Sequence, residues 1–175
     1  MIAILTAFAV AASPPVDTKA TDAVAAFSQL CVGIFTSGKS EIDPLRFSVT
    51  QLDAETVKQV KPDLAGQNLW DVSGKASDAH MLVHYEPAGM CVVEVAEANE
   101  QAIRAEYLNL VDQTAKELSA KAERQEDQIH DVQGKPATTS MWRLDSDQRN
   151  IMLAITTYPD PEFMIQHLMT VSYVR

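Results

Sequence analysis

The chain has 175 residues, of which 46% are hydrophobic, and its formal net charge is −10. This length suits one domain of ordinary size, and the hydrophobic content excludes a disordered chain. The acidic balance argues against binding nucleic acid or an anionic membrane surface through charge.

The first residues predict an export signal. Ile2 to Val10 form a short apolar run, and Ala9-Val10-Ala11 has the small-x-small form of a signal peptidase site. No Lys or Arg precedes the run, so either the true start lies upstream or the signal is weak, and a short buried helix is the alternative. We expect a signal peptide over 1–12, a linker over 13–20 and a single domain over 21–175. No other segment is expected to approach the ~20 apolar residues of a membrane span.

The first helix of the domain is expected to begin at Thr21 as N-cap and to end at Gly38 as a left-handed terminator. Apolar residues follow at helical spacing and place a cysteine on the buried face: Val24, Phe27, Cys31 and Ile34. Residues 39–51 show no pattern that favours a helix, a strand or a loop. Asp53 is the expected N-cap of a short helix that Pro62 ends, and a brief strand is expected around Leu69 to Val72.

A hairpin forms the predicted centre of the fold. Pro87-Ala88-Gly89 suits a three-residue turn because Gly89 can adopt the left-handed conformation. Side chains of a strand alternate between its two faces, so this turn fixes the register as Tyr85 with Cys91, Val83 with Val93 and Met81 with Val95. A two-residue turn would instead set His84 opposite Cys91.

A long amphipathic helix is expected after Asn99, its N-cap. Its apolar stripe consists of Ile103, Tyr107, Leu110, Val111, Thr114 and Leu118. Residues 121–135 are polar and fit a fraying helix end, an edge strand or a loop, of which we favour the loop. Three strands should follow, over 141–144, 151–158 and 164–174. The predicted class is α+β, with a mainly antiparallel sheet of about six strands covered by N-terminal helices and one long central helix.

The sequence contains no recognisable catalytic or metal-binding motif. His80 and His84 have a spacing that would suit two metal ligands on a helix, but on a strand they are ~13 Å apart, and the surface-facing interpretation is favoured for both. No Gly-rich phosphate loop, nucleophile elbow or Cys-x-x-Cys is present. We therefore predict no catalytic residue, no metal site and no cofactor.

Several features together resemble small exported two-cysteine proteins of Gram-negative bacteria. They are the Ala-rich signal, "FSQLCVGIF" around Cys31, "GMCVVEV" around Cys91, the long helix and the "SMWRLD" strand. That family has no assigned activity, so the resemblance implies an exported location, periplasmic or secreted, and a disulfide. The residues themselves also favour a Cys31–Cys91 bond, because both cysteines occupy predicted core-facing positions and an oxidising compartment would pair them.

The leading functional hypothesis is a non-catalytic soluble periplasmic protein that binds a small ligand or another envelope protein, without stable membrane insertion or nucleic-acid binding. The candidate binding surface is the polar sheet face around His84, Glu86 and Glu94. One alternative is a hydrolase-type enzyme in which the fold assembles a site around His84 or His167. A second alternative is an envelope stress or maintenance protein that acts by oligomerisation.

Overall fold

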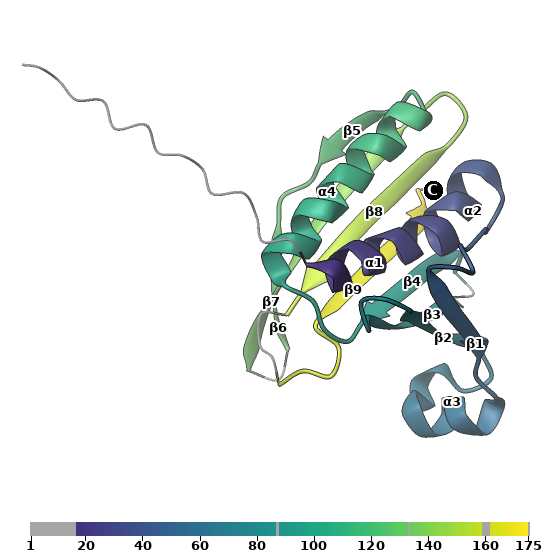
Figure 1. The fold of residues 1–175 in the computed structure, drawn as a ribbon. Coiled ribbons are helices and arrows are strands. Elements are labelled where there is room, and N and C mark those ends of the chain that lie inside the picture. The colour runs from purple at the N-terminus through teal and green to yellow at the C-terminus, as the bar shows by residue number, and fades with distance from the viewer. Residues whose placement is uncertain (1–16, 87, 133, 159–161, 175) are drawn as a thin grey trace, which may run out of the picture.

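A computed structural model describes residues 17–86, 88–132, 134–158 and 162–174 (Figure 1). The predicted signal peptide, most of the predicted linker and residues 159–161, between two of the predicted strands, lie outside the described residues. In chain order, the elements are α1 (Thr18–Phe27), the π-helical η1 (Ser28–Val32), α2 (Gly33–Ser37), β1 (Phe47–Gln51), α3 (Ala54–Val60), the 3₁₀-helix η2 (Pro62–Leu64), β2 (Leu69–Gly74), β3 (His80–Glu86), β4 (Met90–Val95), α4 (Glu100–Glu117), β5 (Lys121–Arg124), β6 (Gln128–Val132), β7 (Lys135–Asp145), β8 (Asn150–Thr157) and β9 (His167–Tyr173).

Within the described residues, nine strands form one sheet in the order β1-β2-β3-β4-β9-β8-β7-β5, and β6 pairs with the other end of β7. Every strand pair is antiparallel. The predicted class, α+β with a mainly antiparallel sheet, is therefore confirmed, but the expected number of about six strands is wrong.

The additional strands lie where the sequence pattern is weakest. β1 falls in the stretch 39–51 that received no assignment, and β5 and β6 fall in the stretch 121–135 that was predicted to be a loop. Every side chain of β5 is exposed, and only the last residue of β6 is partly buried. A strand with no buried face lacks the alternation of apolar and polar residues by which strands are recognised.

Helices α1 and α4 lie side by side on one face of the sheet (Figure 1). α1 contacts β2 and β4, whereas α4 contacts β5 and β8. The predicted long helix is α4, with 18 residues, but it does not lie at the centre of the sheet as expected: α1 and α4 share this face. Its predicted stripe does face the core: Ile103, Tyr107, Leu110, Val111 and Thr114 are buried, and Leu118 is partly buried.

The helix ends follow local capping chemistry. Asp53 and Asn99 cap α3 and α4 as expected, and Gly38 ends α2 in the left-handed conformation with φ of 76°. The expected start at Thr21 is wrong, because Asp17 caps α1 by accepting a hydrogen bond from the Lys19 backbone. Asp17 also accepts a hydrogen bond from the backbone N–H of Asn99, the N-cap of α4. This contact with α4 favours Asp17 over Thr21 as the N-cap of α1.

The continuous helical stretch Thr18–Ser37 spans 20 residues and is long and apolar enough, by length and composition, to cross a membrane. We expected no segment after the predicted signal to be long and apolar enough to cross a membrane, and by this criterion that expectation is wrong. Half of the stretch is buried inside this fold, as in the core helix of a globular domain.

The central hairpin has the predicted register. Tyr85 stands opposite Cys91, Val83 opposite Val93 and Met81 opposite Val95, and Gly89 adopts a φ of 83° in the turn. Met81 and Val83 are buried in the same cluster as Tyr107 and Leu110. Cys31 and Cys91 form the predicted disulfide, with 5.5 Å between their Cα atoms. This bond joins η1 to β4 inside the core.

A second, smaller cluster lies on the opposite face of the sheet. Val57 of α3 and Leu64 of η2 pack there on Leu69 of β2, with Leu52 and Leu82 at the edge. α3 and η2 therefore cover this second face at its β2–β3 end, and the polar groups considered next lie beside that cover.

Candidate functional site

Two of the three predicted surface residues meet on the sheet face opposite α1 and α4. His84 of β3 and Glu94 of β4 lie diagonally across one strand pair, and His84 Nε2 is 3.8 Å from Glu94 Oε1. The expectation that His84 faces solvent is wrong, since its side chain is only 4% exposed. Its strand neighbour Leu69 packs under α3 and η2, and this cover buries the histidine. Glu86 lies near the hairpin turn and is half-buried.

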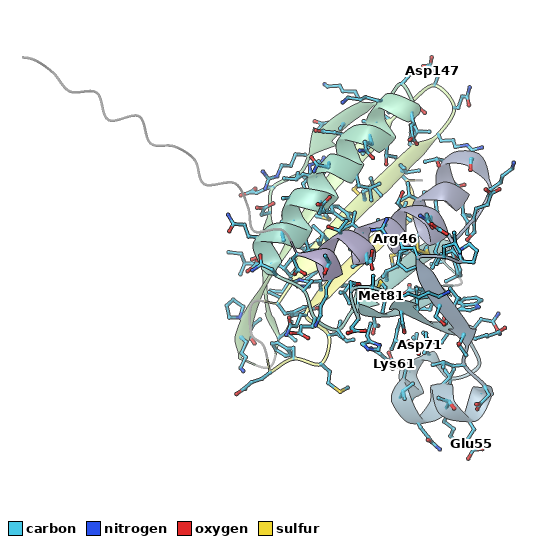
Figure 2. The ribbon with its side chains drawn as sticks, in the orientation of Figure 1. Arg46, Glu55, Lys61, Asp71, Met81 and Asp147 are labelled. Carbon is cyan, nitrogen blue, oxygen red and sulfur yellow. A yellow bond between two sulfur atoms is a disulfide. The ribbon has the colours of Figure 1, made fainter. Side chains whose placement is uncertain are left out.

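Lys61 completes this polar cluster from the end of α3. Its Nζ lies 2.6 Å from Glu94 Oε2, and the Glu94 side chain is only 10% exposed. Figure 2 shows Lys61 between α3 and the strands of the sheet. The ion pair therefore connects the α3–η2 cover to the central strand β4.

The electrostatics keep Glu94 ionised. Burial by itself would raise the pKa of the Glu94 carboxyl, but the interactions with His84 and Lys61 outweigh it and hold the pKa below its ordinary value. Glu94 is therefore a partly buried carboxylate whose charge is balanced by neighbouring cationic or polar groups.

A groove of about 510 Å³ opens above this cluster. Glu94 and Lys61 form its polar floor, and mainly apolar side chains form its walls: Val132, Tyr158, Phe163, Met164, Ile165 and Leu168, with Glu162 at the rim. We call this the Glu94 groove.

Contacts between distant segments hold the walls of the Glu94 groove. The Tyr158 and Phe163 rings are 5.4 Å apart, and Lys135 Nζ lies 5.6 Å from the Phe163 ring centre. Lys135 also pairs with Glu162 at 2.8 Å, which joins β7 to the loop before β9. Burial and the Glu94 charge raise the pKa of Tyr158, so its phenol stays a neutral hydrogen-bond donor.

The candidate surface predicted from the sequence is thus only partly brought together. Glu94 lines the groove, His84 lies behind it, and Glu86 is not among the lining residues. No sequence pattern singled out Lys61, Tyr158 or Leu168. Leu168 stands directly opposite Glu94 on β9, so a correct β4–β9 pairing would have found it. No strand pairing could have found Lys61, because Lys61 reaches Glu94 only through the packing of α3 against the sheet.

The histidine proposed as an alternative base is enclosed by the fold. His167 is 1% exposed, and its Nε2 lies 2.9 Å from the Ala98 carbonyl oxygen. Burial lowers the pKa of its ring. The hydroxyl of its strand partner Thr157 donates to Glu100 and accepts from Arg104, so it is already bound. A substrate has no access to this histidine in the described fold.

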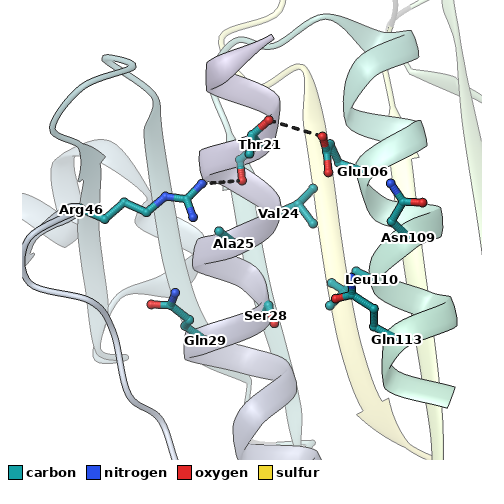
Figure 3. A pocket seen from close by; sticks show the side chains of 10 residues that line it. All are labelled: Thr21, Val24, Ala25, Ser28, Gln29, Arg46, Glu106, Asn109, Leu110 and Gln113. Atoms are coloured by element: carbon teal, nitrogen blue, oxygen red, sulfur yellow. Dashed lines mark hydrogen bonds between the residues drawn. The ribbon is translucent and has the colours of Figure 1, made fainter. Parts of the chain in front are cut away.

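A second groove of about 230 Å³ separates α1 and α4 (Figure 3). Its charged lining residues contact the protein itself: Arg46 pairs with the buried Asp22 and donates to the Thr21 carbonyl oxygen, and Thr21 donates to Glu106. These contacts join the two helices and the β1 segment. We therefore interpret this groove as a polar packing interface between the two helices and not as a ligand site.

Among the described residues, no group of three or more His, Cys, Asp or Glu side chains is placed to hold a metal ion. No known protein family, curated protein or solved structure shows a significant match to the chain. The resemblance to exported two-cysteine proteins therefore stays a prediction, and the Glu94 groove carries the functional argument.

Proposed function

We propose that the protein is a non-catalytic binding protein of the periplasm and that the Glu94 groove holds a small ligand. The observation that carries this proposal is an ionised, largely buried carboxylate, paired with Lys61, in a groove whose other walls are mainly apolar and aromatic side chains. Small-molecule sites typically have volumes of roughly 300–1,000 Å³, with apolar walls and a few convergent polar groups. The groove has this composition.

The lining favours binding over covalent catalysis. None of the described residues that line the Glu94 groove is a serine, threonine or cysteine. His84 lies behind Glu94, with 3.8 Å between its Nε2 and Glu94 Oε1, a distance longer than a hydrogen bond, and it is not among the lining residues. We expect a ligand with an apolar body and one polar group that reaches the Glu94–Lys61 pair.

The disulfide supports an exported location. A buried disulfide is typical of proteins that fold in an oxidising compartment outside the cytosol. The periplasm is the compartment we infer from this bond together with the N-terminal signal pattern.

Native mass spectrometry of protein isolated from the periplasm tests the binding function. We expect wild-type protein to carry a small molecule, and Phe163→Ala to lower its occupancy about tenfold because an aromatic wall is lost. Leu108→Ala is the matched control, since Leu108 is an exposed residue of α4 on the opposite side of the sheet. It should keep wild-type occupancy.

Three results would contradict the proposal, of which the first two concern the small molecule itself. One is wild-type protein that carries no small molecule, and the other is equal occupancy in the Phe163 and Leu108 variants. Recovery of a stoichiometric partner protein in place of a small molecule would also contradict it and would favour the envelope-protein alternative. Thermal unfolding of both variants verifies that the fold is retained.

A further inference from the structure

A separate apolar pocket lies on the helix-covered face of the sheet, at its β1 edge. It has a volume of about 210 Å³ and is lined by Leu30, Ser40, Val49, Trp70, Val83 and Tyr85. We call it the Trp70 pocket. Trp70 and Val83 are strand partners, and both contribute to the main core, so the pocket is an open extension of that core.

The two hydroxyl groups on its wall are already bonded. The Tyr85 hydroxyl donates to the Leu30 carbonyl oxygen at 2.7 Å and also interacts with the Ser40 hydroxyl. Burial raises the pKa of Tyr85, so the phenol stays neutral. No charged side chain is among the described residues that line the pocket. The described wall therefore offers no counterion to a charged ligand, and its tyrosine hydroxyl is already bonded.

The pocket is held in shape by covalent and irregular structure. Leu30 lies in η1, a π-helical turn, and such turns are uncommon and often occur at functional sites. The next residue, Cys31, is bonded to Cys91, which stands opposite Tyr85 in the hairpin. Both sides of the pocket are therefore fixed to the same disulfide, and a ligand would meet a preformed wall.

We propose that the Trp70 pocket binds a small neutral aromatic molecule of one or two rings. An apolar protein cavity of roughly 150 Å³ is large enough to bind benzene, so this pocket has room for a slightly larger ring system. Trp70 and Tyr85 stand edge to face with ring centres 5.6 Å apart, and aromatic walls favour a further ring in an offset or edge contact. A charged ligand would lose its hydration without a partner.

Calorimetric titration of the full domain with toluene and indole tests this proposal, with benzoate as a charged probe of similar size. We expect saturable binding of toluene and indole at one site, and benzoate binding at least about tenfold weaker because its charge has no partner there. Cyclohexane serves as a non-aromatic probe and should bind more weakly than toluene. Equal binding of toluene and cyclohexane would overturn the aromatic class.

Two substitutions on one edge strand locate the site. Val49 faces the pocket, whereas its neighbour Thr50 points to the opposite face of the sheet, and both are exposed. Val49→Phe should fill the pocket and weaken toluene binding at least about tenfold, while Thr50→Phe keeps the wild-type affinity. Ser40→Phe fills the same pocket from the loop before β1 and replaces Val49→Phe if that variant does not fold.

The proposal is overturned if wild-type protein shows no saturable binding of toluene or indole, if benzoate binds as tightly as toluene, or if the pocket-filling variant binds like Thr50→Phe. These outcomes leave the proposed function of the Glu94 groove unaffected, since that groove lies on the opposite face of the sheet and is lined by different residues.

Discussion

At the scale of single residues, the buried Tyr107 and the partly buried Tyr85 differ in how their hydroxyls are satisfied. Tyr107 is fully buried between the rings of Phe27 and Trp142, and its hydroxyl has no hydrogen-bond partner among the described residues. Tyr85 donates to the Leu30 carbonyl oxygen. A buried polar group without a partner costs free energy, whereas a bonded one contributes modestly to stability.

This contrast predicts opposite effects of the same substitution. Tyr107→Phe should raise the free energy of unfolding by about 1 kcal/mol, because the ring packing is kept and an unmet hydroxyl is removed. Tyr85→Phe should lower it by about 1 kcal/mol, because a hydrogen bond to η1 is lost. Urea denaturation of both variants measures the two changes. A loss of stability in Tyr107→Phe would show that its hydroxyl has a partner.

Glu94 predicts a component of acid sensitivity. Its pKa is lower in the folded protein than the ordinary value of 4.5, so its contribution to stability is present above about pH 4.5 and is lost as the pH falls through the folded pKa. Glu94→Gln should therefore reduce the slope of unfolding free energy against pH below about 4.5. Glu86→Gln, on the same face of the sheet but on β3 and outside the groove, should keep the wild-type slope. Equal slopes in all three proteins would contradict this role of Glu94.

At the scale of elements, the sequence was sufficient wherever a segment carried its own pattern. The α4 stripe has buried residues at helical spacing, Asn99 and Asp53 are local caps, and the Pro87–Gly89 turn fixed the hairpin register. The strands β5 and β6 were not predicted, because exposed strands have no alternation of apolar and polar residues.

Contacts between elements were beyond sequence reasoning. The start of α1 was misplaced because Asp17 is favoured over Thr21 by a bond to the start of α4, which is distant in sequence. His84 was expected at the surface because the docking of α3 and η2 on the second sheet face has no local signal. The candidate groove could be predicted only in part for the same reason: Glu94 is marked by its polarity on a strand, but Lys61 is brought to it by tertiary packing.

At the scale of the whole molecule, one strand pair connects two halves of the sheet. β1 to β4 form one side and β5 to β9 the other, and they meet where β4 pairs with β9. The Cys31–Cys91 bond fastens the helical stretch that contains η1 to β4, at this meeting point. η1 also contacts β9, so the disulfide lies where the two sides and the helical layer meet.

The disulfide therefore predicts an ordered loss of structure on reduction. It closes a loop with a sequence separation of 60 residues, and chain-entropy reasoning gives a stabilisation of about 4 kcal/mol for such a loop. Because this is a large part of the roughly 5–15 kcal/mol of a typical domain, reduction should produce a measurable fall in stability. The stretch from Val24 to Ile34 should open first, because it is helical and rests on the sheet through one apolar face, whereas the strands keep their backbone pairing.

Hydrogen exchange measured by mass spectrometry on oxidised and reduced protein tests this order. Exchange in peptides that cover α1 and η1 should rise well before exchange in β4, β8 and α4. A Cys31→Ala, Cys91→Ala variant provides a control that needs no reductant and should show the same pattern. Simultaneous loss of protection in α1, α4 and the strands would contradict the prediction, because it would mean that the helical stretch and the sheet unfold as one cooperative unit.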